Sequence, residues 1–108
     1  MAELTDNQHI VLAEQTLHII DTTLSNMPHK VVGSFSGDKS RFGPQSDLDI
    51  AVRAVDFKGT VALLKAALKV NRIGDPNYRG RQPYGRPNGK DCTLFSEAYT
   101  PVNVIDSL

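Results

Sequence analysis

The chain has 108 residues and one cysteine, with 40% apolar residues, 22% charged residues and a formal net charge of zero. This length and composition predict one globular domain over residues 1–108 and exclude an internal disulfide, a cysteine-rich zinc site and an overall basic field. No apolar run approaches the roughly twenty residues of a membrane span, and we see no signal peptide. We therefore expect no membrane association and a cytoplasmic location.

An amphipathic helix is predicted first. The run Thr5-Asp6-Asn7-Gln8 has the form of a capping box. Apolar residues then recur at spacings of three and four, at Ile10, Ala13, Leu17, Ile20 and Leu24. Ser25, Asn26 and Pro28 end the pattern. His9 and His18 do not share a helical spacing, so we expect these two, and His29 after them, to be solvated and not metal ligands.

Two strands with a loop between them are predicted next, over residues 30–34 and 48–53. The first ends at Gly33-Ser34, which offers the backbone N–H groups and the hydroxyl that a phosphate needs. In the second, Leu48, Ile50 and Val52 share one face, and Asp47, Asp49 and Ala51 share the other. Two carboxylates on one face repel each other unless a cation lies between them. The stretch therefore predicts a site for a metal–nucleotide complex.

A second helix is predicted after Asp56, which can cap it. Its apolar stripe is Phe57, Val61, Leu64 and Leu68, and Gly74 ends it. The segment over residues 74–90 is rich in glycine, proline and arginine, with two tyrosines. It is either a solvated insertion or a surface that guides a nucleotide or single-stranded nucleic acid by charge and stacking. Residues 91–95 and 102–106 are predicted as two further strands with a turn between them.

The stretch Val32-Gly33-Ser34, a spacer, and Ser46-Asp47-Leu48-Asp49-Ile50 resembles the signature of the polymerase-β-like nucleotidyltransferase superfamily, especially its small stand-alone members. The resemblance implies an α/β (α+β) fold with a small mixed sheet and helices packed on one side. It implies that Asp47 and Asp49 hold Mg²⁺ ions against a nucleoside triphosphate, and that Gly33, Ser34 and Ser46 bind the nucleotide.

The chain departs from the family pattern at two positions. Many relatives carry arginine after the Gly-Ser, where this chain has Phe35, and Lys39 or Arg41 could replace that contact or could simply be solvated. The family's third carboxylate matches Asn103, an amide that offers a carbonyl oxygen but cannot act as a base. Asp106 is the nearest acid, and its strand parity is opposite to that of Asn103. The change at position 103 could be natural degeneration or an engineered inactivation.

The resemblance implies two-metal nucleotidyl transfer to an unknown acceptor, protein or RNA, with the second metal in doubt because of Asn103. Activity is expected to be weak or absent, and a helical partner protein or a homo-oligomer is compatible with the family. One alternative is a degenerate fold that acts as a protein- or nucleic-acid-binding module, for example in a toxin–antitoxin pair or in regulation. A third interpretation is a structural or calcium-binding module that uses Asp47 and Asp49.

Overall fold

The structure is a computed structural model that describes residues 6–36, 46–74 and 90–108. In chain order the elements are α1 (Asp6–Thr23), β1 (His29–Val32), the 3₁₀ helix η1 (Gly33–Ser36), β2 (Leu48–Val52), the 3₁₀ helix η3 (Ala54–Asp56), α2 (Phe57–Ala67), β3 (Arg72–Ile73), β4 (Asp91–Phe95) and β5 (Val102–Ile105). The mixed sheet and the two α-helices of these ranges confirm the predicted α/β (α+β) class.

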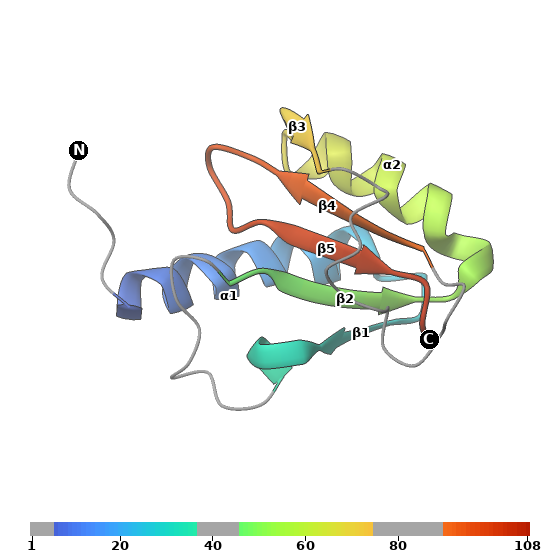
Figure 1. Ribbon diagram of the computed structural model, residues 1–108, viewed down its shortest axis with the longest axis horizontal. Coiled ribbons are helices and arrows are strands. Elements are labelled where there is room, and N and C mark those ends of the chain that lie inside the picture. Colours follow the sequence, from blue (N-terminus) through green and yellow to red (C-terminus); the bar gives the residue numbers. More distant parts are fainter. Residues whose placement is uncertain (1–5, 37–45, 75–89) are drawn as a thin grey trace.

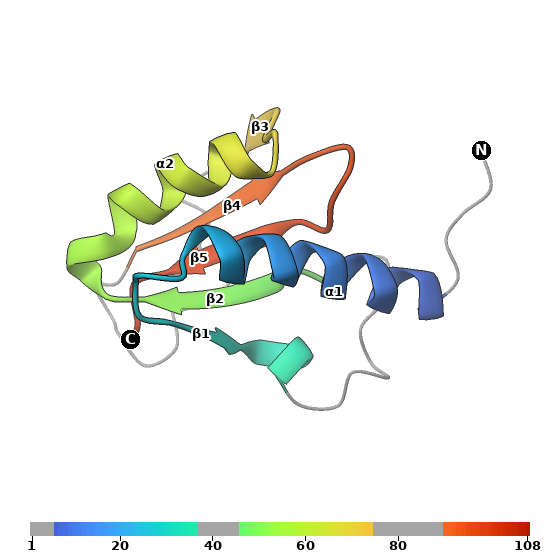
Figure 2. The ribbon, with the colours of Figure 1, turned by 180° about the vertical axis from the view of Figure 1, so that it is seen from behind.

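The five strands lie in the order β1-β2-β5-β4-β3, so β2, β5 and β4 have neighbours on both sides. β2 and β5 are parallel, and every other neighbouring pair is antiparallel. Both α-helices cover the same face of the sheet (Figures 1 and 2). None of the helices in the described residues is long and apolar enough to cross a membrane.

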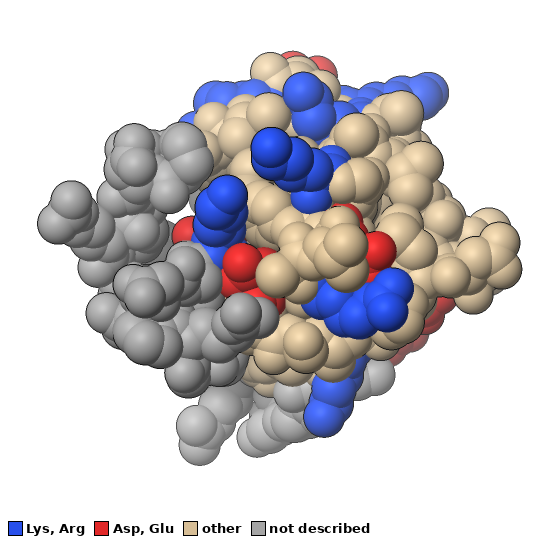
Figure 3. Space-filling model, turned by 90° about the vertical axis from the view of Figure 1, so that its right-hand side faces the viewer, with Lys and Arg blue, Asp and Glu red and all other residues tan. Residues whose placement is uncertain are grey.

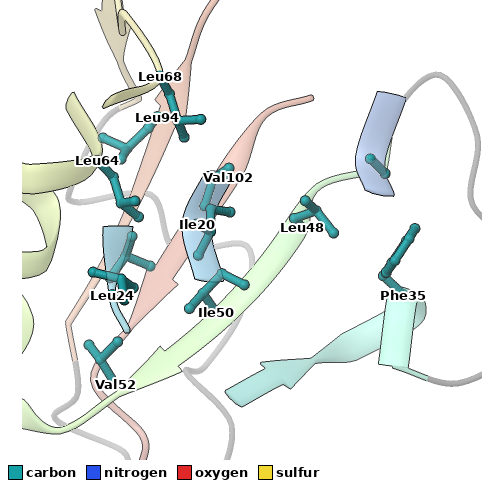
Figure 4. Close-up of a cluster of buried hydrophobic side chains, with 12 residues drawn as sticks. Ile20, Leu24, Phe35, Leu48, Ile50, Val52, Leu64, Leu68, Leu94 and Val102 are labelled. Atoms are coloured by element: carbon teal, nitrogen blue, oxygen red, sulfur yellow. The ribbon is translucent and has the colours of Figure 1, made fainter. Parts of the chain in front are cut away.

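The core lies between that sheet face and the two helices (Figure 4). The alternating residues Leu48, Ile50 and Val52 of β2 are fully buried, as the period-two pattern predicts. The buried core is completed by Ala13, Ile20, Leu24, Phe35, Leu64, Leu68, Leu94, Val102 and Val104. The apolar stripes predicted for both helices therefore face the sheet.

A buried hydroxyl also ties α1 to the turn between β4 and β5. Thr16 is fully buried, and its hydroxyl donates to the Leu12 carbonyl oxygen at 2.7 Å. The same oxygen accepts the backbone N–H of Thr100 at 3.2 Å. One side chain thus pairs a buried backbone donor that would otherwise be costly to bury.

The second helix differs from the prediction at both ends. Asp56 does not cap α2 with its side chain, because its carboxylate accepts a hydrogen bond from Arg53 Nε at 2.7 Å. The helix ends at Ala67, well before Gly74, and Lys69 adopts a left-handed φ of 52°. The N–H of Val70 then donates to the Lys65 carbonyl at 3.0 Å, as in a Schellman motif. The early stop leaves room for β3, which the sequence pattern does not predict.

Candidate functional site

The strand register brings the separated parts of the sequence motif to one end of the sheet. Asp49 lies opposite Val32 of β1 on one side and opposite Asn103 of β5 on the other. Since Leu48 and Ile50 point into the core beneath the helices, alternation places Asp49 on the other face, which α1 and α2 do not cover. Figure 1 shows this face, with the end of β1 beside the start of β2.

The turn after β1 explains why glycine stands at position 33. Gly33 has a φ of 76°, which favours glycine, and it starts η1 directly after Val32. The predicted strand to Ser34 was therefore too long, because the chain leaves the sheet at Gly33. The backbone of Ser34 belongs to η1, but its hydroxyl lies outside the described side chains, so its predicted phosphate contact stays a prediction.

Phe35 has a structural role. Its side chain is 2% exposed and belongs to the core, at the side of the cluster near Leu48 (Figure 4). A charged side chain at this position would have to be buried among apolar groups. The absence of the arginine found in many members of the resembled family is thus matched by a packing residue.

The two predicted metal-binding carboxylates differ in their surroundings. Asp49 lies inside β2 and is 5% exposed, whereas Asp47 precedes the strand and is half-buried, as is Ser46. The backbone N–H of Leu48 donates to the Pro101 carbonyl at 2.9 Å, which holds this segment beside the start of β5. Continuing the pleat by one residue would put Asp47 on the same face as Asp49.

Asn103 lies directly beside Asp49, in the place where the family resemblance expects a third carboxylate. Its amide oxygen Oδ1 accepts a hydrogen bond from the Thr93 hydroxyl at 3.2 Å. Thr93 lies opposite Asn103 in β4, so the row Val32, Asp49, Asn103 and Thr93 crosses four strands. Residue 103 is thus held in line with Asp49, but it supplies an amide where the family has a charge.

Asp106 lies at the opposite end of β5. Its carboxylate accepts the backbone N–H of Lys90 at 2.8 Å, and its own N–H donates to the Lys90 carbonyl at 3.1 Å. It lies three positions after Asn103, which is about 10 Å along an extended chain. At this end of the sheet, basic and acidic side chains are interspersed on the surface (Figure 3). The position of Asp106 therefore does not let it stand in for residue 103.

Several predicted contacts lie outside the described residues. They are the capping residue Thr5, the basic residues Lys39 and Arg41, and nearly all of the glycine-rich segment over residues 74–90, of which Gly74 and Lys90 are described. Both interpretations of that segment, a solvated insertion or a surface that guides a nucleotide or single-stranded nucleic acid, stay predictions.

The structure also brings forward residues that the sequence pattern did not single out. Thr93 bonds Asn103, and Arg72 lies over the ring of Phe95 with Cζ 3.8 Å from the ring centroid. Residue parity in β4 could have placed Thr93 and Phe95 on one face. Only the register of β4 against β5 and β3, however, identifies their neighbours.

The prediction that His29 is solvated is wrong, because its side chain is half-buried. Its Nε2 lies 2.8 Å from Asp21 Oδ1, and its Nδ1 lies 2.9 Å from the Met27 carbonyl oxygen. Burial lowers the pKa of His29, but the Met27 carbonyl and the Asp21 carboxylate outweigh burial, and the net pKa is raised. Both ring nitrogens face acceptors, an arrangement that the protonated imidazole satisfies best.

Comparisons of this chain with protein-family models, with curated proteins and with solved structures found no match.

Proposed function

We propose that this protein binds a magnesium–nucleoside triphosphate through Asp47 and Asp49 and is a nucleotidyltransferase-like protein with weak or no transfer activity. The observation that carries the proposal is the register: Asp49 lies between the Gly33 turn on one side and residue 103 on the other. Three parts of a motif that are far apart in sequence therefore meet at one end of the sheet.

The donor set fits a hard divalent cation. Asp47 and Asp49 offer carboxylate oxygens, and Asn103 offers an amide oxygen beside Asp49, all of which are oxygen ligands of the kind that Mg²⁺ binds. Bound magnesium would neutralise triphosphate charge and lower the pKa of an acceptor hydroxyl. The Gly33 turn would present backbone N–H groups to the terminal phosphates, and the Ser34 hydroxyl and Ser46 would complete their binding.

In the proposed transfer, the acceptor oxygen forms a bond to the α-phosphorus, and the bond from that phosphorus to the bridging oxygen breaks. Pyrophosphate leaves, and the hydroxyl proton passes to solvent. Asn103 cannot take this proton, since an amide is not a base at neutral pH. Asp106 is bound to the Lys90 backbone at the other end of the strand. Both facts support weak or absent turnover.

The proposal is tested first by binding. We expect calorimetry to detect magnesium-dependent nucleoside triphosphate binding, lost in Asp47→Ala and Asp49→Ala and retained in Asp106→Ala. Asp106→Ala is the matched control, because it removes a carboxylate from the same sheet at the opposite end. Each variant is first checked for a cooperative thermal transition. Equal affinity in the double Asp47→Ala, Asp49→Ala variant would overturn the proposal.

Turnover is tested with labelled ATP, GTP, CTP and UTP in the presence of magnesium. We expect Asn103→Asp to raise the rate by on the order of 10²–10³, because a carboxylate stabilises positive charge near the attacking oxygen where an amide contributes only a dipole. If the unchanged protein turns over well and Asp106→Ala abolishes turnover, the assignment of residue 103 is wrong.

Asn103 also favours a second candidate function. A fold that keeps nucleotide contacts but lacks the third charge could act as a regulatory or toxin–antitoxin component that binds a helical protein partner or a second copy. Nucleotide binding without incorporation, in both the unchanged protein and Asn103→Asp, would support this candidate. For either function we infer a cytoplasmic location, with which the free thiol of Cys92 is compatible.

A further inference from the structure

A guanidinium stacked on an aromatic ring lies on the sheet face that α1 and α2 leave uncovered. Arg72 lies opposite Phe95 in the pairing of β3 with β4, and its Cζ is 3.8 Å from the ring centroid. Leu94 between Thr93 and Phe95 is buried in the core, so Phe95 shares the face of Thr93. Arg72 is exposed and Phe95 is half-buried, so the pair is accessible from solvent.

Gly74 lets the ring lie close to the sheet. A Cβ atom at Gly74 would lie 3.2 Å from Thr93 Cβ and 3.3 Å from Phe95 Cε2, which is tighter than ordinary packing. The N–H of Gly74 donates to the Thr93 carbonyl at 2.8 Å, and the N–H of Asn71 donates to the Phe95 carbonyl at 3.0 Å. Backbone hydrogen bonds on both sides of Arg72 thus hold it beside Phe95 of β4.

The pair lies at the same end of the sheet as the candidate site. β4 runs antiparallel to β5, so Phe95 ends its strand where β5 begins. Asn103 and Asp49 lie in the row of Thr93, two residues from Phe95 along β4. Strand spacing puts β4 about 10 Å from β2. The Gly33 turn lies beyond β2 on the opposite side, beside β1. If phosphates bind at that turn, the acceptor would approach Asp49 and Asn103 from the side of β4.

We propose that Arg72 and Phe95 form a stacking platform for a base at the end of a single-stranded RNA that serves as the acceptor. This inference depends on the proposed function, because that function places the acceptor on the β4 side. A guanidinium plane held over a ring offers a flat, positively charged surface, on which a base stacks while a neighbouring phosphate is attracted. The role of the ring is to hold the guanidinium in place on the exposed sheet face.

The test measures binding of a fluorescently labelled single-stranded RNA to the full chain by anisotropy. Arg72→Lys keeps the charge but removes the plane, and we expect it to weaken binding roughly five-fold or more. Phe95→Leu keeps apolar bulk but removes the ring, and it should weaken binding similarly. Lys30→Ala is the matched control: Lys30 is an exposed cation on the same sheet face, opposite Ala51 and at the far edge. We expect it to change affinity less than two-fold.

Magnesium–nucleotide binding is measured on the same samples to separate the two proposals. If nucleotide binds and RNA affinity is equal in the unchanged protein, Arg72→Lys and Phe95→Leu, the platform is wrong and the proposed function stands. If nucleotide binds and the Asn103→Asp variant labels a protein hydroxyl in place of RNA, the platform is again overturned. If nucleotide does not bind, the proposed function fails, and the platform as an acceptor site fails with it. If Arg72→Lys loses RNA affinity and keeps its nucleotide affinity, the stacking platform is supported.

Discussion

At the scale of single residues, the neighbours of Asn103 determine what a carboxylate at this position would do. Thr93 donates a hydrogen bond to the amide oxygen and could donate equally to a carboxylate oxygen. On the other side, the buried Asp49 would face a second negative charge in the adjacent strand. Position 103 could therefore hold an aspartate without a steric clash, but a cation would be needed to offset the repulsion between that aspartate and Asp49.

We predict that Asn103→Asp lowers the free energy of unfolding by on the order of 1 kcal/mol without divalent cations, because like charges directly opposite on a sheet repel. Magnesium should restore the loss by binding only the folded state. Thermal melts with and without magnesium measure both effects, and Asp49→Asn in the same background should abolish the difference. A magnesium-independent melt of the Asn103→Asp variant would contradict the two-carboxylate site.

The second residue-scale prediction concerns pH. His29 has a raised pKa, so the folded state binds the proton more tightly than the unfolded state does. Its contribution to stability is fully present below the unfolded value of about 6.5 and is lost as the pH rises through the folded pKa. Urea unfolding across this range should show stability falling with pH, and Asp21→Asn should flatten that slope. An equally steep slope in His29→Gln would assign the effect to another group.

At the scale of elements, two buried threonine hydroxyls make opposite contributions to the stability of the folded state. The Thr16 hydroxyl pairs the Thr100 N–H and so joins α1 to the turn before β5. Thr60 of α2 is also fully buried, and its hydroxyl oxygen has no hydrogen-bond partner among the described residues. The same substitution at the two sites therefore removes a useful hydroxyl in one helix and an unsatisfied one in the other.

We predict that Thr16→Val lowers the free energy of unfolding by about 1–3 kcal/mol, since it leaves a buried backbone donor unpaired. Thr60→Val keeps the shape and removes an unpaired polar atom, so it should be neutral or stabilising by up to about 1 kcal/mol. Chemical denaturation of both variants measures the difference. Equal losses at the two sites would mean that side-chain shape, and not hydrogen bonding, sets their effect.

At the scale of the whole molecule, the order of the strands predicts an uneven stability. β2 and β5 are paired on both sides and carry fully buried residues, whereas β3 has two exposed residues at the edge of the sheet. We expect the amides of β2 and β5 to show the slowest hydrogen exchange and those of β3 to exchange much faster. Protection of β3 equal to that of β5 would indicate that another part of the chain or a partner covers this edge.

The sequence determined those features that depend on local patterns. The spacing of Ile20 and Leu24 identified the inner face of α1, and the alternation of Leu48, Ile50 and Val52 identified the inner face of β2. The sequence also predicted β4 at residues 91–95, as observed. It identified Asp47, Asp49 and Asn103 as candidate site residues. Side-chain period follows from backbone geometry within one element, so these features can be read without knowing the neighbouring elements.

Only the tertiary structure decided which of these residues meet. The parallel register of β2 with β5 sets Asp49 beside Asn103, and it leaves Asp106 at the far end of the sheet. The burial of Phe35, the bonds of His29 and the stack of Arg72 on Phe95 likewise depend on contacts between distant segments. Strand order and register are fixed by the joint packing of the core, because a shift of one residue would turn every buried side chain to the opposite face.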